Sequence, residues 1–204
     1  MGGCKMTFNW YEEVNSDEEI TQGDILLNFP IVKINNYDEL LDDNVCDKEL
    51  DAEIEYTDYI ILTQPCDLAR PKPELENVIL CKIHDVDASG LAKNRLIEII
   101  QGNAPQFYML NKNEYFNYVD EKNDFKIDIF NYHIVNFDII EKVPISAVKK
   151  YVKNIKKRLR LLPPYREHLS QAFAKYFMRI GLPNDIDRSD FNKYSKGKSN
   201  KSNT

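Results

Sequence analysis

The residues of this chain that are best suited to chemistry stand in one short turn, residues 63–67, with the sequence Thr-Gln-Pro-Cys-Asp. The turn follows an apolar run, and functional side chains often stand where a strand ends. For Cys66 to act as a nucleophile, a base such as His84 or His133 would have to approach it. A positive environment would also have to lower the pKa of its thiol. The turn is therefore a candidate for covalent catalysis.

Two other interpretations of the turn compete with catalysis. In the structural one, Cys66 is a small buried core residue, and Asp67 accepts backbone N–H groups that the neighbouring prolines leave unpaired. In the binding one, the turn presents its polar side chains to a partner. We favour the structural interpretation. The candidate catalytic residues are Cys66, Asp67 and His84, and the candidate binding residues of this segment are Gln64, Cys66, Asp67 and Arg70.

No metal or other cofactor is expected. Zinc accepts cysteine and histidine ligands, so Cys46, Cys66, Cys81 and His84 are the residues to consider. Cys81 and His84 fall on one expected strand, however, where their odd offset points the two side chains to opposite faces. The chain has no CxxC pair, and it has no P-loop, dinucleotide-binding loop, GxSxG or HExxH motif. The sequence thus carries none of these catalytic signatures.

Charge is distributed unequally along the chain, whose formal net charge is -6. Residues 1–60 hold sixteen acidic residues against three basic ones, and residues 149–204 hold fifteen basic residues against four acidic ones. In one interpretation the two ends face each other or are simply solvated. In the other, the basic end forms a face for nucleic acid or for an acidic partner. We favour the first.

Short apolar runs separated by turn residues predict a β-rich body over about residues 7–145. The run 59–63 is β-branched and uninterrupted, which indicates a strand buried on both faces. Residues 91–101 fit a helix and a strand equally well. Several short strands with turns between them are typical of an SH3-like or irregular β-barrel. The other expected strands cover residues 25–32, 77–83, 106–110 and parts of 125–140.

Two helices are expected to close this body over about residues 146–183, which makes the fold class α+β. The first is a cationic helix over residues 148–162, ended by a pair of prolines. The second covers residues 165–180 and has an amphipathic stripe of apolar side chains. Residues 1–186 then form one domain, and residues 187–204 form a disordered basic tail.

The polar residues of each expected helix can be interpreted in two ways. The basic helix over residues 149–160 either contacts nucleic-acid phosphates or docks on the barrel with a solvated basic face, which we favour. The second helix presents one polar face that is either a recognition stripe or an ordinary solvent face. The candidate binding residues of that helix are Arg166, His168, Gln171, Lys175 and Arg179.

Two stretches resemble a loosely defined group of uncharacterised bacterial proteins. The first joins residues 23–26 (GDIL) to residues 59–69 (YIILTQPCDLA), an apolar strand followed by Thr/Ser-Gln/Pro-x-Cys-Asp-Leu/Ile. The second is the run 159–169 (LRLLPPYREHL), which continues through Gln171, Phe173, Arg179, Gly181 and Pro183. The resemblance implies no defined activity. Members of this kind often look like accessory genes of bacterial mobile or defence islands, which implies such a context here.

The Gly-Asp-Ile start followed by a strong strand also resembles the SH3-like barrel of the MazF/PemK endoribonuclease toxins. Members of that family have a characteristic Arg-Pro pair before the second strand, whereas here Arg70-Pro71 follows the strand. The resemblance therefore implies a barrel more than it implies ribonuclease activity.

These observations together favour a non-enzymatic binding or accessory module with a protein partner, in a bacterial defence, mobile-element or toxin–antitoxin-like system. The alternative is a MazF-like endoribonuclease or a Cys66-dependent hydrolase. No apolar stretch approaches the roughly 20 residues that span a bilayer, so no membrane association is expected. The N-terminal residues lack the apolar core of a signal peptide, and the cysteine spacing suits reduced thiols. We therefore expect a cytoplasmic protein.

Overall fold

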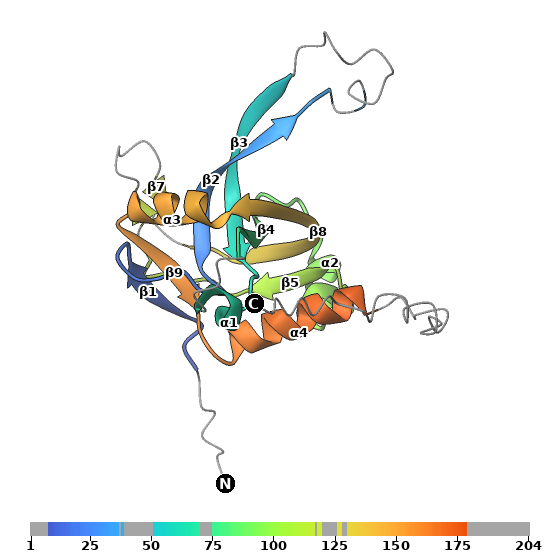
Figure 1. Ribbon diagram of the computed structural model, residues 1–204. Helices are drawn as coiled ribbons and strands as arrows, with labels where there is room; N and C mark the ends of the chain where they lie inside the picture. The colour runs from blue at the N-terminus through green and yellow to red at the C-terminus, as the bar shows by residue number, and fades with distance from the viewer. Residues whose placement is uncertain are drawn as a thin grey trace, which may run out of the picture.

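The computed structural model describes residues 8–36, 38, 51–69, 75–116, 118–119, 126–127 and 130–178 (Figure 1). The expected basic tail, together with Arg70 and Arg179, lies outside these residues. The described chain is a mixed α+β protein with a mostly antiparallel sheet and four helices, so the predicted fold class is confirmed. Among the described helices, none combines the length and the apolar character that a membrane crossing requires.

A five-stranded antiparallel sheet forms the centre of the molecule, with strand order β2-β3-β4-β8-β5. Strands β2 and β5 are its two edges, so the described strands do not close a barrel, and the SH3-like barrel is not confirmed. Two further pairs are β1 with β9 and β6 with β7. The strands are β1 Tyr11–Asn15, β2 Ile25–Ile34, β3 Ala52–Ile61, β4 Asn77–Asp85, β5 Phe107–Leu110, β6 Tyr118–Val119, β7 Lys126–Ile127, β8 His133–Pro144 and β9 Lys157–Leu161.

The central sheet is buried on both faces, as the sequence of β3 predicts. Tyr59, Ile60 and Ile61 all have 0% exposure. The side chain of Ile60 belongs to one apolar core, which α4 (Tyr165–Phe177) covers with Leu169. The neighbouring side chains of β3 belong to a second core, on which α3 (Ile145–Lys153) packs. Two helices thus cover opposite sides of one sheet.

The prediction of a cationic helix over residues 148–162 is wrong for the second half of that range. Helix α3 ends at Lys153, and β9 follows as a strand antiparallel to β1. Leu159 and Leu161 are buried in a core, while Arg158 and Arg160 alternate with them and contact Asp24. This alternation has the period of a strand, and the long-range ion pairs that stabilise it are invisible to a local helical pattern.

The other helices agree with the sequence or resolve its ambiguities. Helix α4 confirms the second C-terminal helix from residue 165 to 177, and its expected end at residue 180 lies outside the described chain. The segment 91–101, which fits a helix and a strand equally well by sequence, forms helix α2 (Lys93–Ile100). The short helix α1 (Pro65–Ala69) contains most of the cysteine turn.

Gly23 joins the start of β2 to β9. Its N–H donates to Ile61 O at 2.9 Å, and its carbonyl accepts the N–H of Leu161 at 3.0 Å. The backbone has φ of +87°, and a Cβ at this position would lie 3.0 Å from Leu161 Cβ. Only glycine fits here without strain. The Gly-Asp pair is therefore a structural junction.

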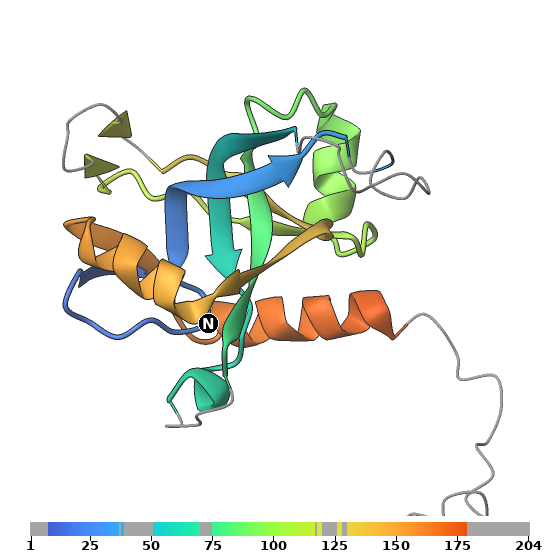
Figure 2. The same ribbon diagram turned by 45° about the horizontal axis from the view of Figure 1, so that its top comes forward.

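Strands β2 and β3 extend beyond the body as a two-stranded ribbon (Figures 1 and 2). We call its outer part, residues 30–34 and 52–56, the β2–β3 arm. The register pairs Val32 with Ile54 and Pro30 with Tyr56 on one face. Val32 is 66% exposed, and Ile54 and Tyr56 are each 59% exposed. One face of the arm is thus apolar and open to solvent.

Candidate functional site

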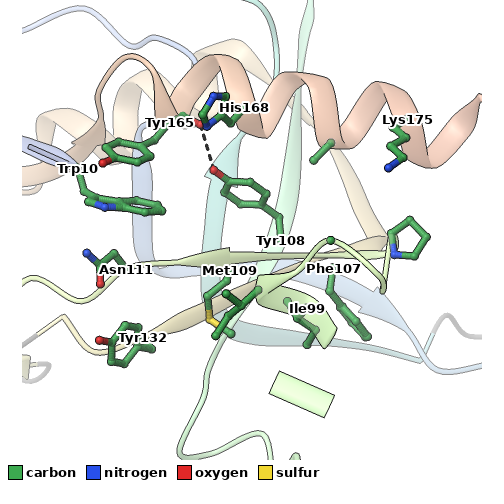
Figure 3. A pocket seen from close by; sticks show the side chains of 14 residues that line it. Trp10, Ile99, Phe107, Tyr108, Met109, Asn111, Tyr132, Tyr165, His168 and Lys175 are labelled. Atoms are coloured by element: carbon green, nitrogen blue, oxygen red, sulfur yellow. Dashed lines mark hydrogen bonds between the residues drawn. The ribbon is translucent and has the colours of Figure 1, made fainter. Parts of the chain in front are cut away.

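A cavity of about 550 Å³ lies between α4, α2 and β5 (Figure 3). This volume falls in the range of small-molecule sites, roughly 300–1,000 Å³. Helix α4 contributes residues 165, 168, 172 and 175, whose spacing of three, four and three places them on one helix face. The cavity is lined by Trp10, Ile99, Ile100, Gly102, Pro105, Phe107, Tyr108, Met109, Asn111, Tyr132, Tyr165, His168, Ala172 and Lys175.

Helix α4 is held in place at its first turns. Ser170 Oγ donates to Gln22 Oε1 at 3.0 Å, and Gln22 Nε2 donates to the carbonyl of Leu62 at 2.8 Å. The side chain of Leu169 is fully buried in the core. The helix face that lines the cavity is therefore fixed relative to the central sheet.

Three aromatic residues form one end of the cavity. The rings of Trp10 and Tyr165 stack with a centroid distance of 3.7 Å and an angle of 11°. The Tyr108 hydroxyl donates to the carbonyl of Tyr165 at 3.3 Å, as the dashed line in Figure 3 marks. Burial, with a smaller contribution from Tyr165, raises the pKa of Tyr108 to about 12. The phenol therefore stays protonated at neutral pH and remains a hydrogen-bond donor.

Lys175 contributes a positive charge to the described lining of the cavity. Apart from tyrosines, His168 and Lys175 are the ionisable residues among the described residues of the lining, which include no aspartate or glutamate. Both residues stand on α4, seven positions apart, which corresponds to about 10 Å along the helix axis. In Figure 3 His168 lies beside the aromatic end and Lys175 near the other end.

A second hollow of about 640 Å³ adjoins the cavity and shares Trp10, Asn111 and Tyr132 with it. Its lining is more polar and includes Glu13 and Lys112. Trp10 therefore lines both spaces. The sequence contains a single tryptophan, so its fluorescence reports on this place alone.

The structure places the cysteine turn on the surface. Cys66 is exposed, and its Sγ lies 3.6 Å from Gln64 Oε1. The interpretation of Cys66 as a buried core residue is therefore wrong. Thr63 has the structural role instead, because its buried Oγ1 accepts the N–H of Ile79 at 2.7 Å. The N–H of Asp67 donates to the carbonyl of Gln64 at 3.0 Å in the first turn of α1.

The structure does not bring His84 to the cysteine turn. In the β3–β4 ladder Ile61 pairs with Leu80 at one end, which is the end that leads to the turn. His84 lies four residues beyond Leu80 on β4. At the usual rise of a strand, His84 is therefore about 13 Å from Leu80. Burial lowers the pKa of His84. His133 pairs with Asp85 next to it, so it lies at the same remote end.

The described residues contain no group of three or more histidine, cysteine, aspartate or glutamate side chains that could hold a metal ion. Of the cysteines considered above for zinc, Cys81 is buried, and its Sγ donates to the carbonyl of Asn136 at 2.9 Å. Cys46 lies outside the described residues.

The predicted polar face of α4 divides between two environments. His168 and Lys175 line the cavity, and Gln171 is exposed outside it. Arg166 packs near Gly23 and forms an ion pair with Glu167 at 2.9 Å. Sequence reasoning found the two basic residues of the cavity but missed its aromatic residues, which come from four separate segments. The one available signal was the single tryptophan at position 10.

The basic segment 149–160 meets the acidic N-terminal segment. Lys157 pairs with Glu13 at 2.8 Å, Lys149 pairs with Glu19 at 3.3 Å, and the two arginines of β9 pair with Asp24. The interpretation that the two ends of the chain face each other is confirmed for these residues. Contact of the segment with nucleic acid stays a prediction.

The chain matches no protein-family model, and the comparison with curated proteins finds no relative. The fold and the cavity thus define the protein only as a mixed α+β protein with an aromatic-lined cavity. The resemblances to the bacterial group and to the MazF/PemK toxins stay predictions.

Proposed function

We propose that this protein is a non-enzymatic binding module and that its ligand is a small organic molecule with a flat ring, held in the cavity between α4 and β5. The observation that carries the proposal is the stack of Trp10 on Tyr165 at the wall of a cavity of about 550 Å³. A ring that stacks on an exposed aromatic face gains roughly 0.5–1.5 kcal/mol beyond the burial of its area.

The composition of the lining supports a binding site more than a packing defect. Apolar and aromatic side chains provide most of the wall, and a few polar groups are fixed by the fold. The Tyr108 hydroxyl is held by the carbonyl of Tyr165, and the backbone of Trp10 is held by the N–H of Leu162 at 2.8 Å. Such a wall is preformed, so a ligand need not order it on binding.

Binding is favoured over hydrolysis by the positions of the candidate catalytic groups. A cysteine nucleophile needs a base within hydrogen-bond reach. Cys66 stands beyond the end of the β3–β4 ladder opposite to the end that carries His84 and His133. The accessory role in a bacterial defence or mobile-element system rests on the sequence resemblance, and the genes beside this one would test it.

The experiment is a fluorescence titration of the single tryptophan with N-phenyl-1-naphthylamine, a neutral molecule in which an NH group joins a naphthalene to a phenyl ring. We expect saturable quenching of Trp10 with energy transfer to the bound molecule. Ala172→Phe places a ring in the cavity and should weaken binding about tenfold or more, equivalent to about 1.4 kcal/mol. The control is Ala174→Phe on the exposed side of the same helix, which should leave the affinity within about twofold. Non-saturable quenching, or equal affinity in both variants, would overturn the proposal.

A further inference from the structure

The described lining of the cavity carries the positive charge of Lys175 and no negative charge. The chain has a formal net charge of -6, yet the described residues that line this cavity include no aspartate or glutamate. Neighbouring acids are paired elsewhere: Glu98 with Arg95 at 2.6 Å, and Glu167 with Arg166. In the part of the chain that the structure describes, no acidic side chain pairs with Lys175. Lys175 is exposed and lines the cavity, so its ammonium group is free to form a charge-assisted hydrogen bond with an anionic group of a ligand.

We propose that the cavity selects aromatic molecules that carry one anionic oxygen group, with the ring at the Trp10 end and the anion directed along α4 to Lys175. This inference names the ligand class of the proposed binding site and rests on that function. The imidazole of His168 stands between the two positions and can donate a hydrogen bond to the same ligand (Figure 3).

The dimensions of the cavity agree with this arrangement. The stacked rings of Trp10 and Tyr165 stand beside His168, whose ring centroid is 6.3 Å from that of Tyr165. Lys175 lies two helical turns further on, about 10 Å along the axis. A molecule with one or two fused rings and a carboxylate, sulfonate or phosphate has a comparable length. A neutral molecule would fill the apolar wall but leave the ammonium group of Lys175 without a counter-charge.

The test compares two molecules with the same rings. The anion 8-anilino-1-naphthalenesulfonate differs from N-phenyl-1-naphthylamine by one sulfonate group, so their ratio of affinities isolates the anion. We expect the intact protein to bind the sulfonate about five- to tenfold more tightly at low salt, and added salt to reduce the difference. Energy transfer from Trp10 also reaches dye molecules bound elsewhere on a protein of this size, so variants are needed to place the bound molecule.

Four variants locate the effect. Lys175→Met should lower the affinity for the sulfonate about fivefold and leave the affinity for the neutral molecule unchanged, and Lys175→Arg should retain the preference. Lys150→Met removes an exposed lysine of α3 and should change neither the affinity for the sulfonate nor the affinity for the neutral molecule. The double variant Val32→Thr/Ile54→Thr removes apolar side chains of the β2–β3 arm, another surface that such molecules can contact, and should also change neither.

The outcomes separate this inference from the proposed function. Equal binding of the two molecules, or an equal loss for both in Lys175→Met, would overturn the anion preference while the binding site stands. A loss in Lys150→Met as large as that in Lys175→Met would also overturn it, because general charge would then explain the effect. Absence of binding by both molecules would overturn the proposed function itself.

Discussion

Arg158 Nε lies 2.8 Å from Asp24 Oδ2, and both side chains have 0% exposure. The remaining guanidinium donors of Arg158 bind the backbone carbonyls of residues 15, 18 and 19 at 2.8–3.0 Å. Asp24 also accepts the Nε of Arg160 at 2.6 Å and the N–H of Thr21 at 3.1 Å. This buried network joins the start of β2 to β9, although the residues are more than 130 positions apart in the chain.

Replacing Arg158 with methionine should destabilise the protein by about 3 kcal/mol. The loss has two causes: Asp24 keeps its buried charge with only Arg160 as a cationic partner, and three backbone carbonyls each lose one hydrogen bond. Urea-induced unfolding followed by circular dichroism measures the change. Lys157→Met breaks the partly exposed pair with Glu13 and serves as the control, with an expected cost of about 0–1 kcal/mol. Equal costs for both variants would show that the buried pair has no special role.

The apolar stripe of α4 should contribute unequally along its length. Leu169 is fully buried, whereas Phe177 is 54% exposed near the end of the helix. Leu169→Ala is expected to cost about 2–5 kcal/mol because it leaves a cavity in the packed core. Phe177→Ala should cost much less, near the range of about 0.5 kcal/mol seen for surface changes. Thermal and urea unfolding of the two variants compare the positions, and a smaller loss for Leu169 would contradict the packing described above.

Stability should fall in mild acid, partly because of His84. Burial, supported by the charges of Lys82 and His133, lowers the pKa of His84 below its ordinary value of about 6.5. The unfolded chain therefore binds more protons in this range, so the free energy of unfolding decreases as the pH falls from about 6.5 to the folded pKa.

His84→Gln should make the slope of unfolding free energy against pH smaller between about pH 6.5 and 5. Urea titrations at half-unit steps of pH measure this slope in the variant and in the original protein. The slope above pH 7 acts as an internal control, since a neutral histidine contributes nothing there. An unchanged slope in mild acid would show that burial does not affect the protonation of His84.

The cysteines Cys66 and Cys81 should react differently with N-ethylmaleimide. Cys66 is exposed, whereas Cys81 is buried, and burial with the nearby charge of Asp138 raises the pKa of its thiol. The thiolate is the reactive form, so the native protein should be modified at Cys66 within minutes and at Cys81 only after unfolding in urea. Mass spectrometry of the two peptides measures this order. Comparable rates in the native protein would contradict the burial of Cys81.

Much of the local structure follows from the sequence. The β-branched run 59–63 and the amphipathic period of residues 165–177 identify a strand and a helix, because burial of a regular face imposes a regular spacing on apolar residues. The two basic residues His168 and Lys175 were identified as binding candidates because they share a helix face. These inferences depend on neighbours in the chain alone.

Tertiary structure decided the features that depend on distant partners. Residues 157–161 have leucine and arginine in alternation, and whether they form a helix or a strand depends on Asp24, which only the folded chain brings to them. The cavity likewise needs Trp10, Tyr108 and Tyr165 at one place, although each stands in a different segment. The sequence by itself determined which faces must be buried, because hydrophobicity is a property of each residue. Which faces meet was decided by packing, because a contact is a property of two segments.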